Sequence, residues 1–259
     1  MREFLAELQS RGRSLVTFGW LNLTFALLFL IFWGSTDAAV MGINAWIKPL
    51  KFALSIALYS FTFAWLLSYL KSERHRNVIG WTLIVCMSSE ILVIALQAAR
   101  GETSHYNTSS PLNAALFATM GLFIGVNTVM NAAVWVLFML PGRTTLEGAQ
   151  LLAWRAGLFF FFAGSLAGGL MIQHLAHTVG AADGGPGISF FNWSTRAGDL
   201  RIPHFLTLHG LQAVPLFWWL IGRHTSNPRA VVLGFVVIFA LVSLLLHALA
   251  LNGIPLFVD

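Results

Sequence analysis

The sequence has little charge and almost no cysteine. Only 10% of its 259 residues are charged, compared with about 25% in ordinary soluble domains, and this scarcity excludes a solvated globular protein. The single cysteine, Cys86, cannot form an internal disulfide. Motifs of high specificity are also missing, since the chain has no GxSxG, no Walker loop and no HExxH. Familiar hydrolase and nucleotide-binding families are therefore not indicated.

Apolar residues are abundant instead. Hydrophobic residues make up 57% of the chain and the mean hydropathy is +0.76, which is typical of a protein that lives in a bilayer. Seven apolar runs near 20 residues long predict an all-α integral membrane protein, a single bundle of about seven transmembrane helices that forms one domain over residues 1–259. The expected spans are residues 15–33, 50–70, 78–98, 112–140, 151–177, 203–221 and 230–251.

The positions of lysine and arginine predict the orientation. With the N-terminus inside and the C-terminus outside, ten of the 15 cationic side chains fall on the cytoplasmic side. The same bias explains the sequence pI near 10.0 without nucleic acid as a partner. We expect an N-in/C-out protein of the bacterial inner (plasma) membrane, with the lipid bilayer as its first partner.

Histidines gather at one level of the predicted bundle. Six of the eight fall on the predicted outer side, and they are His105, His174, His177, His204, His209 and His247. His174 and His177 are expected to end the fifth span on one helical face, because residues three apart are neighbours on a helix. His204 and His209 begin the sixth span five residues apart, about 140° around the helix, so they cannot face the same neighbour. Of these two, we expect His209 to be the buried one.

This histidine layer predicts a binding site for a transition metal or haem. Imidazole suits iron, copper and zinc, and two histidines on facing helices suit haem. The candidate ligands are His174, His177, His204, His209 and His247. Small residues below His174, among them Gly164 and Ala167, are expected to form a notch for a neighbouring helix rather than for a flat macrocycle.

An acid lies at a similar depth in the third predicted span. Glu90, Gln97 and Arg100 share one helical stripe, and an ionisable group in hydrocarbon should face the bundle interior. Glu90 is therefore the candidate catalytic residue. Cations at the outer helix mouths would suit an anionic substrate, haem propionates or lipid phosphates. The candidate cofactor-binding residues are Lys51, Gln97, Arg100, Arg201 and Gln212.

Three functions remain open. We favour a membrane protein, possibly an oxidoreductase, whose outer-leaflet histidines hold the metal or haem. The first alternative is a zinc-dependent intramembrane hydrolase with Glu90 as general base, acting on a small-molecule or lipid substrate that enters from the outer side. The second is a transporter or proton relay of a small anion or ion. In outline the chain resembles the seven-span zinc hydrolases of the ceramidase and adiponectin-receptor type. Its last span carries only His247, where that group pairs histidines four apart, so neither residues nor activity are carried over.

Overall fold

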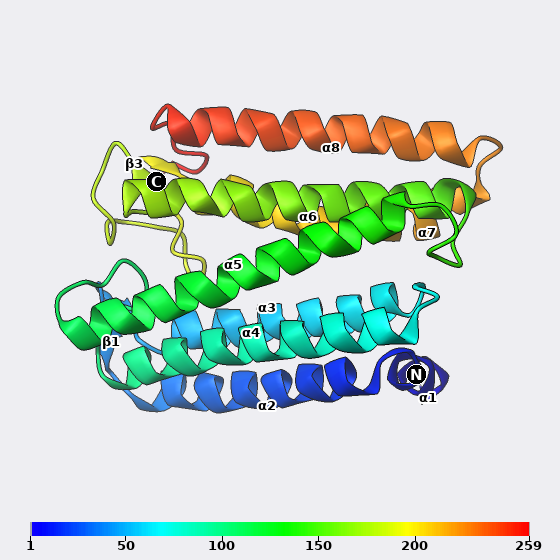
Figure 1. Ribbon diagram of the computed structural model, residues 1–259. Helices are drawn as coiled ribbons and strands as arrows, with labels where there is room; N and C mark the ends of the chain where they lie inside the picture. The colour runs from blue at the N-terminus through cyan, green and yellow to red at the C-terminus, as the bar shows by residue number, and fades with distance from the viewer. Residues whose placement is uncertain (1, 259) are drawn as a thin grey trace. The chain divides into compact units, whose positions relative to one another are not determined.

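The computed structural model describes residues 2–258 and is built from long helices (Figure 1). Within these residues, seven helices are long and apolar enough to cross a membrane, which confirms the predicted all-α membrane architecture. The N-in/C-out orientation and the assignment to a single domain stay predictions. The helices are α1 (Arg2–Arg11), α2 (Arg13–Ser35), α3 (Ile47–Leu67), α4 (Glu73–Ala99), α5 (Pro111–Met139), α6 (Gly148–His174), α7 (Arg201–Leu220), the short 3-10 helix η1 (Gly222–His224) and α8 (Pro228–Leu251).

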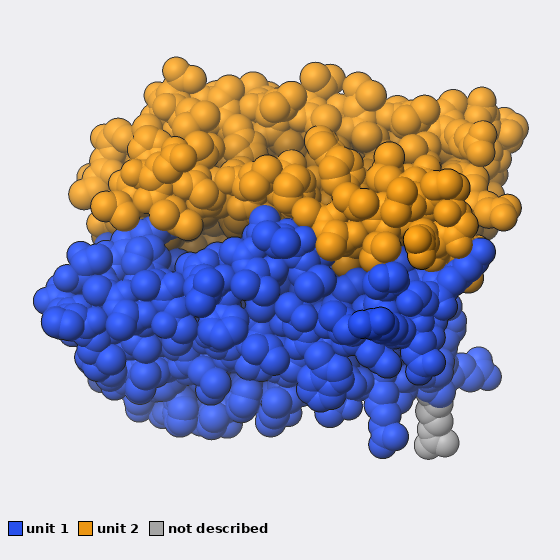
Figure 2. All heavy atoms as spheres, viewed as in Figure 1, with its two compact units in different colours: residues 1–130 blue, residues 131–259 orange. Residues whose placement is uncertain are grey.

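The chain divides into two compact units, residues 1–130 and 131–259 (Figure 2). Each unit contains a helix, a two-stranded antiparallel hairpin and then two further helices. In unit 1 the order is α2, β1 (Ala39–Val40) with β2 (Ile43–Asn44), α3 and α4, and in unit 2 it is α6, β3 (Thr178–Val179) with β4 (Gly198–Asp199), α7 and α8. The helix α5 belongs to unit 1 in its first part and to unit 2 in its last. The two units therefore share one order of elements, and α5 lies between the two sets in the sequence.

The core of unit 2 depends on glycines of α6 that let α7 approach closely. A Cβ at Gly157 would lie 3.1 Å from the carbonyl oxygen of Gly210, and one at Gly164 would lie 2.9 Å from the backbone nitrogen of Leu208. The notch predicted on the fifth span is thus filled by a helix, as expected. Aromatic rings complete the contact between α7 and α8, where Phe217 and Phe235 stack with ring centroids 4.1 Å apart.

The end of α6 differs from the prediction. The fifth span was expected to continue to residue 177, but α6 ends at His174 because Leu175 adopts a left-handed conformation with φ 48°. His177 therefore lies outside the helix, directly before β3, and its carbonyl accepts a hydrogen bond from the Leu200 N–H. The expectation that His174 and His177 share one helical face is wrong for this reason.

Candidate functional site

Four histidines of unit 2 lie near one another. His247, His209 and His177 each lie within electrostatic range of His204. They come from three places in the sequence: α7 supplies two, α8 supplies one, and the segment between α6 and β3 supplies His177. His174, the fifth predicted ligand, is exposed at the last residue of α6. The histidine group is therefore centred on His204.

Three of these rings are fixed by hydrogen bonds to backbone carbonyls. The Nδ1 atom lies 2.8 Å from the Gly164 oxygen in His204, 2.7 Å from the Phe205 oxygen in His209 and 2.8 Å from the Ser243 oxygen in His247. A carbonyl oxygen only accepts, so each Nδ1 carries the proton and donates it. The Nε2 atom of each neutral ring then keeps its lone pair, which is the arrangement found in histidines that bind metals.

His204 and not His209 is the α7 histidine that lies against α6, and both residues are half-buried, so the expectation that His209 is the buried one of the two is not met. His204, not His209, packs between α6 and α7, where a Cβ added to Gly168 would lie 2.9 Å from the His204 Cε1 atom. His209 instead lies against Phe205, with ring centroids 4.1 Å apart. The physical reason is the rotation of α7, which turns positions 204, 208 and 211 toward the glycines of α6. His209 lies about 100° away from Leu208 around the helix.

Residues 2–258 contain no site at which three or more side chains could bind one metal ion. No group of three or more His, Cys, Asp or Glu residues in this part of the chain could hold a metal ion. The zinc hydrolase requires three protein ligands, so we do not carry that alternative further. A haem needs only one or two histidines, and that possibility is independent of a three-ligand group.

His177 is held by an acid that the sequence did not single out. Its Nδ1 lies 2.6 Å from Asp183 Oδ2, and Asp183 also accepts hydrogen bonds from the backbone N–H groups of His177 and Thr178 and from the Thr178 hydroxyl. Burial of the carboxyl would by itself raise the pKa of Asp183. The hydrogen bonds, together with the nearby charge of His177, outweigh burial and hold that pKa well below its usual range.

We expect Asp183→Asn to loosen this turn in a pH-dependent way. The depressed pKa of Asp183 contributes stability above about pH 3.9, the usual value for aspartate, and this stability is lost as the pH falls toward the folded-state pKa. At neutral pH, the amides of residues 177 and 178 should exchange with solvent about tenfold faster in the variant. The difference should shrink only below about pH 4. Hydrogen exchange measured by mass spectrometry, with the exposed Asp37→Asn as control, checks this. Equal exchange at neutral pH would contradict it.

Arg201 lies at the entrance of α7 and is bound to an acid. Its Nε and Nη2 atoms lie 2.9 and 2.6 Å from the two oxygens of Asp199, whose side chain is fully buried. Nη2 also donates to the backbone oxygen of Asn192. Arg201 thus orders the start of α7. The expected contact of Arg201 with a cofactor stays a prediction. Gln212, about three turns further along α7, is half-buried.

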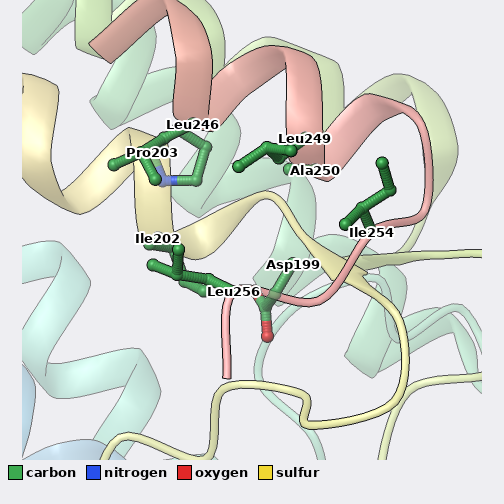
Figure 3. Close-up of a pocket in the computed structure, with 8 residues that line it drawn as sticks. All are labelled: Asp199, Ile202, Pro203, Leu246, Leu249, Ala250, Ile254 and Leu256. Carbon is green, nitrogen blue, oxygen red and sulfur yellow. The ribbon is translucent and has the colours of Figure 1, made fainter. Parts of the chain in front are cut away.

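A small pocket lies beside Asp199 (Figure 3). It holds about 180 Å³ of empty space, open water included, and apolar residues of α7, α8 and the C-terminal segment form most of its wall. Asp199 is its one acidic residue, as Figure 3 shows. Ligand pockets usually hold about 300 to 1,000 Å³, so this space is too small for a haem.

A second group of polar residues lies in unit 1. Gln97 is fully buried and its Oε1 atom accepts a hydrogen bond of 2.6 Å from Arg100. Both side chains also donate to Asn113 Oδ1, at 3.0 Å each. Asn113 of α5 therefore holds Gln97 and Arg100 together, and the sequence analysis did not single it out.

Glu90 and two cations complete the candidate residues of unit 1. Glu90 is 4% exposed, which agrees with the expectation that an acid in this span faces inward. Lys48 lies close enough for its charge to act on Glu90, and Lys51 is half-buried one turn further along α3. The catalytic role expected for Glu90 stays a prediction.

Comparisons with known protein families, with curated protein sequences and with solved structures found no match to this chain.

Proposed function

We propose that the chain is a membrane redox protein in which His209 of α7 and His247 of α8 would hold a haem. One observation carries the proposal. Both rings donate Nδ1–H to a backbone carbonyl of their own helix, which leaves Nε2 of each free to bind iron. The bound haem would supply single-electron transfer by cycling its iron between two oxidation states.

The surroundings of His209 favour a flat apolar group. Phe205 lies against the ring, and Trp193 lies 5.5 Å from Phe205 between ring centroids. Phe191 stacks on Trp193 at 4.6 Å. Phe191 and Phe205 remain 36% and 39% exposed. Aromatic rings prefer such offset or edge contacts at these spacings.

His204 fits a supporting position better than a ligand position. Its ring fills the space over Gly168 and bonds to the Gly164 carbonyl, so a porphyrin face could approach it only if α6 and α7 separated. His247 and His209 are under no such restriction from the glycines of α6. The proposal therefore assigns His204 to the packing of α6 against α7.

The test is the absorption spectrum of the purified protein. The chain is expressed with a haem precursor in the medium, extracted in mild detergent and measured oxidised and after reduction with dithionite. We expect a Soret band, a sharpened α band on reduction and stoichiometric iron by elemental analysis. A colourless protein that also fails to bind added haemin would overturn the proposal, and so would stoichiometric zinc without colour.

A further inference from the structure

Glu90 is a buried acidic side chain of unit 1 that has no part in the haem proposal. It lies nine residues before the end of α4, about 14 Å along the helix from that end. Its side chain is buried, and within the described part of the chain its Oε1 atom has no hydrogen-bond partner. A buried carboxylate oxygen without a donor is costly. The carboxyl group therefore has a reason to hold a proton.

A cation and an imidazole connect Glu90 to the segment between α4 and α5. Lys48, in the first turn of α3, acts on Glu90 through its charge. Its Nζ atom lies 3.1 Å from Nδ1 of His105. An ammonium group only donates, so in this contact His105 Nδ1 accepts and its proton is on Nε2. His105 is half-buried, which leaves part of its ring within reach of water.

The other ionisable groups near Glu90 are few. On α4 the thiol of Cys86 feels the charge of Glu90, and Arg100 is bound to Gln97 and Asn113. On α3, Lys51 lies one turn after Lys48. The phenol of Tyr59 donates to Asn127 Oδ1 at 2.8 Å and is therefore engaged. On α2, the residues between Arg13 and Ser35 include no ionisable side chain.

We propose that Glu90 is a proton-binding site that exchanges its proton with water at the α4–α5 segment through Lys48 and His105. The proposal concerns unit 1 and is independent of the haem proposal for unit 2. The ligand of the Glu90 site is a proton. A metal ion or an organic cation at Glu90 would be repelled by the ammonium group of Lys48.

The exchange balances in protons. In the outward direction, the Lys48 ammonium gives a proton to His105 Nδ1 while His105 Nε2–H gives one to water. The neutral amine of Lys48 then takes the proton of Glu90 through an intervening water molecule, and leaves a carboxylate. The inward direction starts from the resulting tautomer: the carboxylate takes a proton from Lys48, the amine takes the Nδ1 proton, and water reprotonates Nε2. One proton moves in each direction, and every group returns to its first state.

The experiment is infrared spectroscopy of the full-length protein in lipid. As the pH is lowered, we expect the C=O band of a carboxylic acid in an apolar environment to appear in the wild type. Glu90→Gln should lose this band. The matched control Glu147→Gln, which changes an exposed acid at the start of α6, should retain it. A band that persists in Glu90→Gln, or no band at any pH, would overturn the proposal.

The path is tested separately by transfer into D₂O. Deuteration shifts the Glu90 band, and its rate should fall about tenfold or more in Lys48→Met and His105→Phe, because each removes one member of the relay. Lys71→Met, at an exposed lysine between α3 and α4, should exchange at the wild-type rate. Unchanged rates in both relay variants would refute the path. Should Glu90→Gln fail to fold, Glu90→Asp serves in its place. This variant keeps a carboxyl group but shortens the side chain, so the C=O band should shift in frequency without disappearing.

Discussion

Substituting His209 or His247 by alanine is expected to strip haem from the purified protein while the helical bundle still folds. Each variant should retain less than about a tenth of the wild-type haem, since even weakened support of a ligand typically costs 10-fold to 100-fold in affinity. The fold should survive because each ring bonds only to a carbonyl four residues earlier in its own helix. Loss of such a bond costs about 1 kcal/mol. Haem content and helix content by circular dichroism are the two measurements.

Two further histidine variants make the result specific. His224→Ala changes an exposed ring in η1 that accepts a hydrogen bond from Arg223, and it should keep wild-type haem. His204→Ala removes the bond to Gly164 and opens a cavity over Gly168, so its main effect should be on thermal stability, by about 1–3 kcal/mol. Full haem retention in His209→Ala, or equal loss in all four variants, would contradict the assignment of ligands.

The spans were predictable because their signal is local and repeated. Apolar run length is set directly by bilayer thickness, and each of the seven long apolar helices of residues 2–258 begins and ends within about five residues of its predicted run. The short helix α1 (Arg2–Arg11) was not predicted. The end of α6 was not predictable in this way. The sequence after Met171 continues with a helical pattern through His177, and no glycine marks the stop at Leu175. What ends the helix is a competing set of bonds to Asp183, six residues beyond His177.

Helix rotation limited the prediction of the candidate site. The sequence shows that His204 and His209 point to different sides of α7, but it does not say which side meets α6. That choice depends on which side chains of α7 fit against the glycines of α6, in this case Leu208 against Gly164 and His204 against Gly168. The burial of Glu90 was easier to predict, because the cost of an acid facing lipid applies whatever the neighbouring helices are.

The shared order of helices and hairpin in the two units was also not predicted from the sequence. The hairpin between α2 and α3 and the hairpin between α6 and α7 have different lengths of chain between their strands. Asn44 Oδ1 accepts from the Trp46 N–H and Asp199 Oδ1 accepts from the Arg201 N–H, each two residues later. The same local bond thus prepares the start of α3 and of α7, with an amide in one unit and a carboxylate in the other. Only the carboxylate of Asp199 requires a cation, and Arg201 supplies it.

Arg201→Ala is expected to be the most destabilising single substitution at the entrance of α7. It leaves the fully buried Asp199 carboxylate with backbone donors from Ser194 and Arg201 alone. Removing one partner of a buried ion pair costs about 3–5 kcal/mol, because the remaining charge is uncompensated. The arginine also holds the Asn192 carbonyl, so the segment before β4 should loosen as well. Thermal unfolding in detergent, with the exposed Arg196→Ala as control, measures the effect.

A double-mutant cycle separates the charge from the packing. If the cost of Arg201→Ala comes from an unpaired carboxylate, then adding Asp199→Asn should recover part of the lost stability, since a neutral amide needs no cation. If the cost comes from lost contacts of the arginine chain, the two substitutions should add. Asp199→Asn alone should cost less than Arg201→Ala, because the arginine it leaves unpaired is 26% exposed and can reach water. An Arg201→Ala variant no less stable than Arg196→Ala would show that the ion pair contributes nothing, and that hydrophobic packing alone fixes the start of α7.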